Sequence, residues 1–214
     1  ITERGVGNGM SVLIFTSIIA VIPAQFANIL SSRGVLTFTI TMLIGLVVIT
    51  FVVFVEQAQR RIPVQYAKRM VGRRMYGGTS TYIPLKVNMA GVIPVIFASS
   101  LLFLPTLFVQ LSGSQAEWAQ WLERTYGTGT GGIYLATYFL LIVFFCYFYV
   151  AITFNPTEVA DNMKKYGGFI PGIRAGRPTA EYLDYVLTRL TAPGSLYLGV
   201  IAVIPVFAFD FLGV

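Results

Sequence analysis

The sequence has no histidine, a single cysteine and few charged residues. The lack of histidine excludes a Ser–His–Asp triad and a His-ligated metal site. The one cysteine, Cys146, cannot form an intrachain disulfide or a Cys-based zinc site. A Gly-rich phosphate loop of the Walker type is also missing from the sequence. These absences argue against an enzyme and predict neither a metal nor a cofactor.

Charge is scarce, at 11% of the 214 residues. A soluble domain has about 25% charged residues, so this chain has too little polar sequence to cover a soluble core. Hydrophobic residues make up 56% of the chain and come in long blocks. The uncharged runs cover residues 5–32, 34–55, 87–116, 125–157 and 190–209. An ordinary soluble fold is therefore excluded.

Each uncharged run is long enough to cross a membrane. A span needs roughly 20 apolar residues, because about 30 Å of hydrocarbon is crossed at about 1.5 Å per residue. Backbone groups in lipid must find partners within their own segment, which predicts helices. We therefore expect an all-α membrane protein, a polytopic transmembrane helix bundle with five spans. The expected spans are about 10–30, 36–55, 89–110, 133–154 and 190–209.

The basic residues predict the orientation of these spans. Of the fifteen Lys and Arg residues, all but Arg33 and Arg124 lie near the N-terminus or in two loops, 56–87 and 155–189. Basic residues are retained in the cytosol, so the N-terminus and both loops are expected there and the C-terminus outside. The chain begins at Ile1 without an initiator Met, and we expect it to be part of a larger membrane protein.

Two features inside the spans have alternative explanations. Pro94 lies inside the third expected span and cannot donate to the carbonyl of residue 90, which predicts a kink. The small residues around it fit either ordinary bundle packing or a mobile, pore-facing helix. Ile14 and Ile18 are one helical turn apart and share a face. Composition alone favours a lipid-facing or core position for this pair.

The first cytosolic loop holds seven basic residues. Every second residue from Ile62 through Val64 to Tyr66 is apolar or aromatic, and this alternation predicts a short projecting ribbon. Its basic residues serve either retention and attraction to anionic lipid or docking of an anionic partner such as ribosomal RNA. Arg73 and Arg74 lie in the middle of the loop, far from either span, and favour docking.

The second cytosolic loop is expected to contain a short helix capped by Thr157, followed by a Gly- and Pro-rich tip. The tip, residues 167–179, presents Arg174 between glycines. Thr179 is expected to cap the helix that continues into the last span. A lone Arg in a loop is usually solvated, but a shaped tip raises the chance of a contact.

Long stretches of the sequence resemble the SecY family, the central subunit of the bacterial protein-conducting channel. These stretches are ITERGVGNGMS (1–11), FVVFVEQAQRRIPVQYAKR (51–69), GRRMYGG (72–78), STYIPLKVNMAGVIPVIFASS (80–100), FNPTEVADNMKK (154–165) and FIPGIRAGRPT (169–179). Family members have ten helices in two halves, and the resemblance makes these spans the fifth to ninth. Residues 1–214 are thus expected to form part of a SecY-like channel domain.

The resemblance also implies roles for particular residues. Ile14, Ile18 and Ile96 match an apolar ring that constricts the family's pore, which replaces the lipid-facing interpretation of the first two. A collar of branched aliphatic side chains offers no partner to water or ions and gates by dewetting. Asn88, Ser99 and Ser100 match the lateral gate, the seam that opens toward lipid.

The family's cytosolic loops receive the ribosome or the motor ATPase SecA. Arg73 and Arg74 resemble positions of ribosome docking, and Arg174 resembles an Arg needed with SecA. The family usually has Pro after that Arg, whereas Ala175 follows it here and is expected to loosen the tip slightly. Other implied partners are SecE, SecG, signal sequences, unfolded secretory chains and membrane lipids, in the bacterial plasma membrane.

The resemblance thus implies a passive pore for secretory proteins that also releases membrane segments sideways. The alternative is a secondary transporter or small-solute channel whose basic loops serve only topology. A transporter is expected to have a polar cluster at a broken midplane helix, and no such cluster is evident in the sequence.

Overall fold

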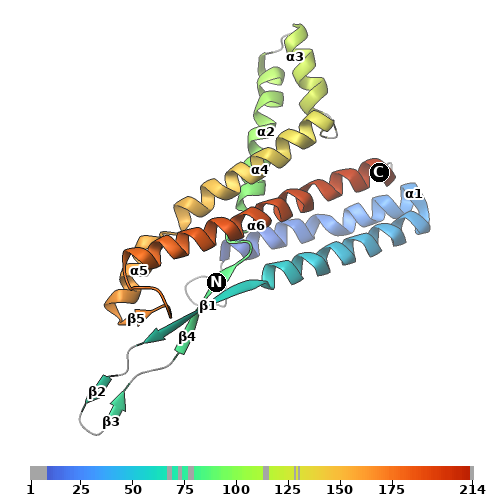
Figure 1. Ribbon diagram of the computed structural model, residues 1–214. Helices are drawn as coiled ribbons and strands as arrows, with labels where there is room; N and C mark the ends of the chain where they lie inside the picture. The colour runs from blue at the N-terminus through green and yellow to red at the C-terminus, as the bar shows by residue number, and fades with distance from the viewer. Residues whose placement is uncertain are drawn as a thin grey trace. The chain divides into compact units, whose positions relative to one another are not determined.

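The computed structural model describes residues 9–66, 69–71, 74–76, 80–112, 116–127, 129 and 131–212. The helices are α1 (Gly9–Gln57), α2 (Ile93–Ser112), α3 (Glu117–Leu122), the π-helix η1 (Glu123–Gly127), α4 (Gly132–Thr153), α5 (Pro156–Lys165) and α6 (Arg177–Leu212). The strands are β1 (Gln59–Tyr66), β2 (Arg69–Val71), β3 (Arg74–Tyr76), β4 (Ser80–Lys86) and β5 (Gly168–Phe169). Figure 1 shows the ribbon of the chain with most of these helices and strands labelled.

The chain forms two compact units, which are described separately. The first comprises Ile1–Thr50 and Phe211–Val214, and the second comprises Phe51–Asp210. Five helical segments are long and apolar enough to cross a membrane, by length and composition. They are Ser11–Ser32, Gly34–Gln57, Ile93–Ser112, Gly132–Lys165 and Arg177–Phe207. The prediction of an all-α membrane protein with five spans is confirmed.

The first unit consists mainly of α1, which is two helices joined at Gly34. Gly34 has φ 79° and ψ 175°, a backbone conformation that favours glycine and interrupts the helix. The Phe26 and Phe38 rings meet edge-on at 5.7 Å across this break. Hydroxyl side chains in both halves donate to carbonyls of the preceding turn, as Thr16 does to Val12 at 2.8 Å. Such bonds satisfy polar side chains where water is absent.

In the second unit α2 begins later than expected, so the predicted kink at Pro94 is wrong. The helix starts at Ile93, after a turn in which Gly91 has φ 62°. Pro94 therefore lies in the first helical turn, where the backbone N–H has no intrahelical acceptor in any case. The ring removes no hydrogen bond at this position, and the helix has no reason to bend there.

The membrane-level core of the second unit joins α2, α4 and α6. Its buried residues are Ala90, Ala98, Leu102, Tyr138, Ile142, Cys146, Val150, Leu187 and Leu198. Small residues at Ala98 and Cys146, both at most 2% exposed, let α2 and α4 approach closely. This core holds α2 by one face and leaves the opposite face uncovered.

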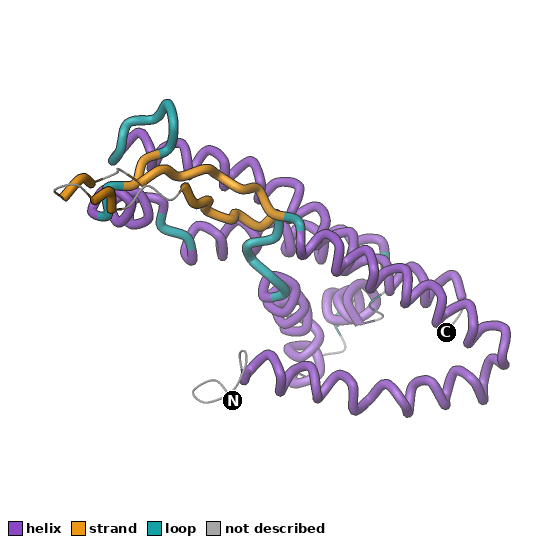
Figure 2. Tube along the Cα trace, turned by 90° about the horizontal axis from the view of Figure 1, so that it is seen from below, coloured by secondary structure: helices purple, strands orange, loops and turns teal. Residues whose placement is uncertain are grey.

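A second core lies under the strands, and we call it the extramembrane core because β1, β4 and β5 lie outside the five candidate spans. β1 pairs antiparallel with β4, with Ile62 opposite Ile83, and β5 adds to the other edge of β1. The two long strands run side by side beyond the end of α1 (Figures 1 and 2). The core residues are Ile62, Val64, Leu85, Met163, Ile170, Leu183 and Val186. The predicted ribbon is confirmed, and α5 and α6 cover its apolar face.

The two expected helix caps in the second loop are wrong. The N-cap of α5 is Asn155, whose Oδ1 accepts from the backbone N–H groups of Thr157 and Glu158. Asn155 directly precedes the proline at the first helical position, the usual place for a cap. α6 already begins at Arg177, so Thr179 lies inside its first turn, and its hydroxyl donates to the carbonyl of Arg174 at 2.8 Å.

Candidate functional site

The exposed face of α2 carries three of the residues that the resemblance marks. Ile96 is 46% exposed, and Ser99 and Ser100 are exposed beside it. These positions share one helical face, because residues three and four apart lie on the same side. The opposite face, with Pro94, Ala98, Leu102 and Val109, is buried. α2 is thus held by one face against α4 and presents the other free of packing.

Both serine hydroxyls on this face are satisfied within α2. The Ser99 and Ser100 hydroxyls donate to the carbonyl of Ile96, at 2.9 and 2.8 Å. Neither bond would break if α2 moved away from a neighbouring element. The face therefore combines an apolar side chain with small polar ones whose hydrogen bonds are independent of any partner.

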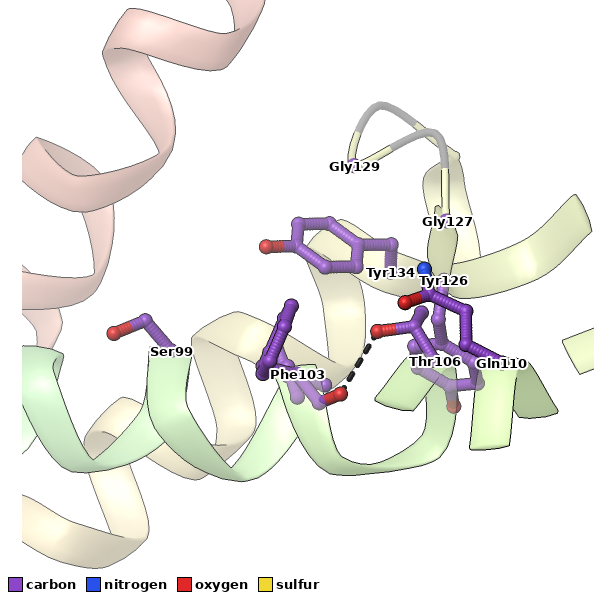
Figure 3. A pocket seen from close by; sticks show the side chains of 9 residues that line it. Ser99, Phe103, Thr106, Gln110, Tyr126, Gly127, Gly129 and Tyr134 are labelled. Carbon is purple, nitrogen blue, oxygen red and sulfur yellow. Dashed lines mark hydrogen bonds between the residues drawn. The ribbon is translucent and has the colours of Figure 1, made fainter. Parts of the chain in front are cut away.

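Ser99 also lines a pocket that extends along the C-terminal half of α2 (Figure 3). The pocket has a volume of about 290 Å³, and its other lining residues are Leu102, Phe103, Thr106, Gln110, Tyr126, Gly127, Gly129 and Tyr134. Figure 3 shows Thr106, Gln110 and Tyr134 grouped at one side, with the Thr106 hydroxyl bonded to the carbonyl of Phe103 at 2.8 Å. None of these lining residues carries a formal charge.

Asn88 does not share the exposed face of Ser99 and Ser100. It lies just before α2 and is 4% exposed. Its amide donates to the Glu56 carboxylate at 2.5 Å and to the carbonyl of Gly91 at 3.3 Å, while its Oδ1 accepts from the N–H of Gly91 at 3.1 Å. Asn88 therefore ties the end of α1 to the turn that starts α2.

The Glu56–Asn88 pair was not predicted from the sequence. A signal was present: Glu56 and Asn88 bracket the first loop, and the two ends of a loop that returns to the membrane have to lie near one another. Near them the Tyr197 hydroxyl of α6 donates to the carbonyl of Val52 at 3.4 Å. The end of α1, the start of α2 and α6 therefore meet at one junction.

Ile14 and Ile18 lie in α1 within the first unit, with 46% and 59% of their surface exposed. They share a face, as the spacing predicts. Ile96 belongs to the second unit, and each unit is described by itself. All three isoleucines of the predicted ring are thus uncovered apolar side chains in membrane-spanning segments, and their assembly into a ring stays a prediction.

Arg174 is exposed at a tip whose backbone is well anchored. Ile170, 4% exposed, and Ile173 pack into the extramembrane core on the N-terminal side. The carbonyl of Arg174 accepts the Thr179 hydroxyl at 2.8 Å. Gly172 and Gly176, with φ 83° and 105°, allow the sharp turns on either side. The tip thus holds its backbone while the guanidinium faces solvent.

The first loop is only partly described. Arg73 lies outside the described residues, and Arg74 begins β3, where it pairs with Val71 of β2. Nearer the membrane, the Arg61 guanidinium lies 4.8 Å from the centre of the Tyr82 ring on the exposed face of the ribbon. This pair was missed, because two strands have to be in register before it forms. Among the described residues no cluster of metal ligands occurs.

The SecY family profile matches residues 1–213 of the chain. The protein translocase subunit SecY of Streptomyces griseus is 66% identical over 212 residues, which cover 97% of this chain and 48% of that protein. Those of Streptomyces scabiei and Mycobacterium bovis are 64% and 65% identical, and the chain covers 50% and 48% of them. The chain therefore spans about half the length of the curated relatives it matches.

Solved structures agree on the fold. The chain superposes on "The structure of a protein conducting channel" with a TM-score of 0.57 and 19% identity, covering 86% of this chain and 46% of that one. A SecY structure on the plug domain gives the same TM-score at 22% identity, covering 86% of this chain and 47% of the other. At this identity the likeness concerns the fold alone. With a profile match over nearly its whole length and relatives about two-thirds identical, the chain belongs to the SecY family.

Proposed function

We propose that the full-length protein is the pore-forming subunit of the Sec protein translocase. It passes unfolded secretory proteins across the membrane and releases membrane segments sideways through a lateral gate. The identity to proteins named protein translocase subunit SecY carries this proposal. Because the chain spans half of those proteins, the pore belongs to the full-length protein rather than to residues 1–214 alone.

The two-faced α2 supports a role as a gate helix. Its buried face packs on α4, and its uncovered face bears Ile96, Ser99 and Ser100. An apolar ring of Ile14, Ile18 and Ile96 seals against ions by dewetting and yields to any passing side chain, because dispersion contacts are non-directional. Asn88, bonded to Glu56 and Gly91 just before α2, would hold the N-terminal end of the helix when the gate opens.

The extramembrane core supports docking of a partner. It presents Arg174 on an anchored tip and Arg61 with Tyr82 on a ribbon, both facing solvent. We assign Arg73, Arg74 and Arg174 to ribosome or SecA docking, where basic side chains meet ribosomal RNA or acidic surfaces. SecE and SecG, the other expected partners, complete the complex in the bacterial plasma membrane.

A secondary transporter or small-solute channel is not favoured. A transporter needs a substrate or ion site at midplane, and the runs 34–55, 87–116, 125–157 and 190–209 contain no ionisable Asp, Glu, Lys or Arg. The relatives are protein translocase subunits.

The proposal is tested by a photo-crosslinker at Ile96 in the full-length protein. A stalled secretory chain is expected to crosslink there, because the exposed face of α2 lines the passage. The same probe at Leu102, 5% exposed on the opposite face, is the matched control and is expected to capture no cargo. Failure at Ile96 while probes at Ile14 or Ile18 succeed would remove Ile96 from the ring, and failure at all three would overturn the pore.

A further inference from the structure

Two arginines line one pocket where β1 passes α6. Arg60 and Arg189, together with Tyr185, Val186 and Leu190, surround a cavity of about 390 Å³. This volume is in the range of small-molecule sites, about 300–1,000 Å³. The lining contains no acidic side chain. The cavity therefore offers two positive charges on an apolar floor.

The strand alternation directs Arg60 to this cavity. Residues two apart on a strand share a face, so Arg60 is on the same face as Ile62 and Val64. Those two are 2% and 0% exposed in the extramembrane core. Arg61 points to the other face, where it lies over the Tyr82 ring. Arg60 thus sits at the edge of the core facing α6, and its neighbour Arg61 does not.

The cavity lies at the level of the membrane boundary. The Tyr197 hydroxyl bonds the carbonyl of Val52, which fixes α6 against the end of α1. Arg189 precedes Tyr197 by eight residues and Arg60 follows Val52 by eight, so both arginines lie on the same side of this contact. From Leu190 to Phe209 the chain carries no charge, and the span that contains Val52 ends at Gln57. The two guanidinium groups therefore mark the end of the apolar region.

Neither guanidinium is neutralised by an acid within the described part of the chain. The ion pair seen in this region joins Arg177 to Glu181 at 3.0 Å, and the nearby Glu56 is held by Asn88. Arg189 lies 5.3 Å from the centre of the Tyr185 ring, a contact that leaves its N–H donors available. Guanidinium groups match phosphate oxygens with two parallel hydrogen bonds, and basic pockets at the cytosolic boundary suit anionic headgroups.

We propose that Arg60 and Arg189 bind the phosphate headgroup of an anionic membrane lipid. Val186 and Leu190 form the apolar floor of the cavity, against which the first part of the lipid's acyl chains would pack. A bound lipid would bridge the first strand of the ribbon and the start of the last span. It would thereby steady the extramembrane core, with its docking residues, against the membrane surface.

The test measures lipid retention by the full-length protein, by native mass spectrometry after reconstitution in phosphatidylcholine with phosphatidylglycerol. Arg60→Gln and Arg189→Gln are each expected to lower retained phosphatidylglycerol by about fivefold, the effect of one basic residue near an anionic surface. Arg61→Gln is the matched control: it removes the same charge one residue away on the opposite face and is expected to change retention little. Arg60→Lys, which keeps the charge, is expected to recover part of the binding.

Three outcomes would overturn the proposal. Equal losses in Arg60→Gln and Arg61→Gln would mean diffuse attraction without a site. Unchanged retention in both Arg60→Gln and Arg189→Gln would mean that the cavity holds no lipid. Displacement of phosphatidylglycerol by millimolar inorganic phosphate would mean a site for free anions. Both arginines are exposed, so unfolding of the variants is not expected, and lipid retention is read without any translocation assay.

Discussion

At the scale of single residues, glycine and asparagine set the closest contacts of the second unit. Gly194 of α6 lies so close to the backbone of Val87 that an added Cβ would overlap the Val87 carbonyl oxygen. Asn88, the next residue, uses its amide and its carbonyl oxygen in the Glu56 and Gly91 bonds. The chain segment between β4 and α2 thus packs directly against the backbone of α6 at Gly194, and the hydrogen bonds of Asn88 hold it to Glu56 and Gly91.

Gly194→Ala is expected to destabilise the protein by about 1–3 kcal/mol, because the overlap is with backbone that cannot rotate away. Gly45→Ala is the control, since a Cβ at Gly45 meets nothing within 4 Å and alanine is the better helix former. The two variants are compared by thermal unfolding in detergent. An unchanged melting temperature in Gly194→Ala would mean that α6 does not approach Val87 this closely.

At the scale of elements, the second loop presents a fixed backbone with a free side chain. The tip is held by the buried Ile170 and by the Thr179 hydroxyl on the Arg174 carbonyl. These contacts do not involve the Arg174 guanidinium. A change of this side chain therefore alters what the tip touches and leaves the fold of the loop in place.

Arg174→Glu in the full-length protein is expected to lower SecA-driven export by about tenfold or more, because a contact becomes a repulsion of at least about 1.4 kcal/mol. Membrane insertion of the subunit itself should be nearly unaffected. Lys165→Glu is the control: it makes the same charge change at an exposed residue of α5, nine residues before Arg174 and outside the tip. Equal loss of export and insertion in Arg174→Glu would assign Arg174 to folding or topology.

At the scale of the whole molecule, the distribution of charge predicts the orientation in the membrane. Arg33 and Arg124 are expected on the outer side, and the other thirteen basic residues on the cytosolic side. Tyr166, 77% exposed, belongs to the expected cytosolic side, and Trp118, 49% exposed in α3, to the expected outer side.

Orientation is tested by single-cysteine labelling of the otherwise cysteine-free full-length protein. With a membrane-impermeant thiol reagent, Trp118→Cys is expected to react in intact cells and Tyr166→Cys only after the membrane is opened, since lipid blocks the reagent. A cysteine at Ala98, which is fully buried, should stay unlabelled in both conditions. The reverse pattern would invert the topology and place the docking loops outside the cytosol.

Much of this architecture could be predicted from the sequence because the bilayer imposes simple requirements. Apolar runs of about twenty residues have to be helices. The cytosolic location of the basic loops stays a prediction. The alternation of apolar residues at Ile62 and Val64 also predicted the ribbon, because successive side chains of a strand point to opposite faces. The errors were also local and concerned helix starts. The helices near Pro94, Thr157 and Thr179 begin a few residues from the predicted positions, because several neighbouring residues can serve as the first residue or the cap of a helix.

The class of protein, the number of spans and the family resemblance could be read from the sequence, because they depend on composition and on the order of residues along the chain. The free face of α2, the Asn88–Glu56 bond and the pocket lined by both Arg60 and Arg189 follow only from the folded chain. Each of these depends on residues from separate segments coming within a few ångströms. Packing and strand register produce that proximity, and neither is written in any single stretch of the chain.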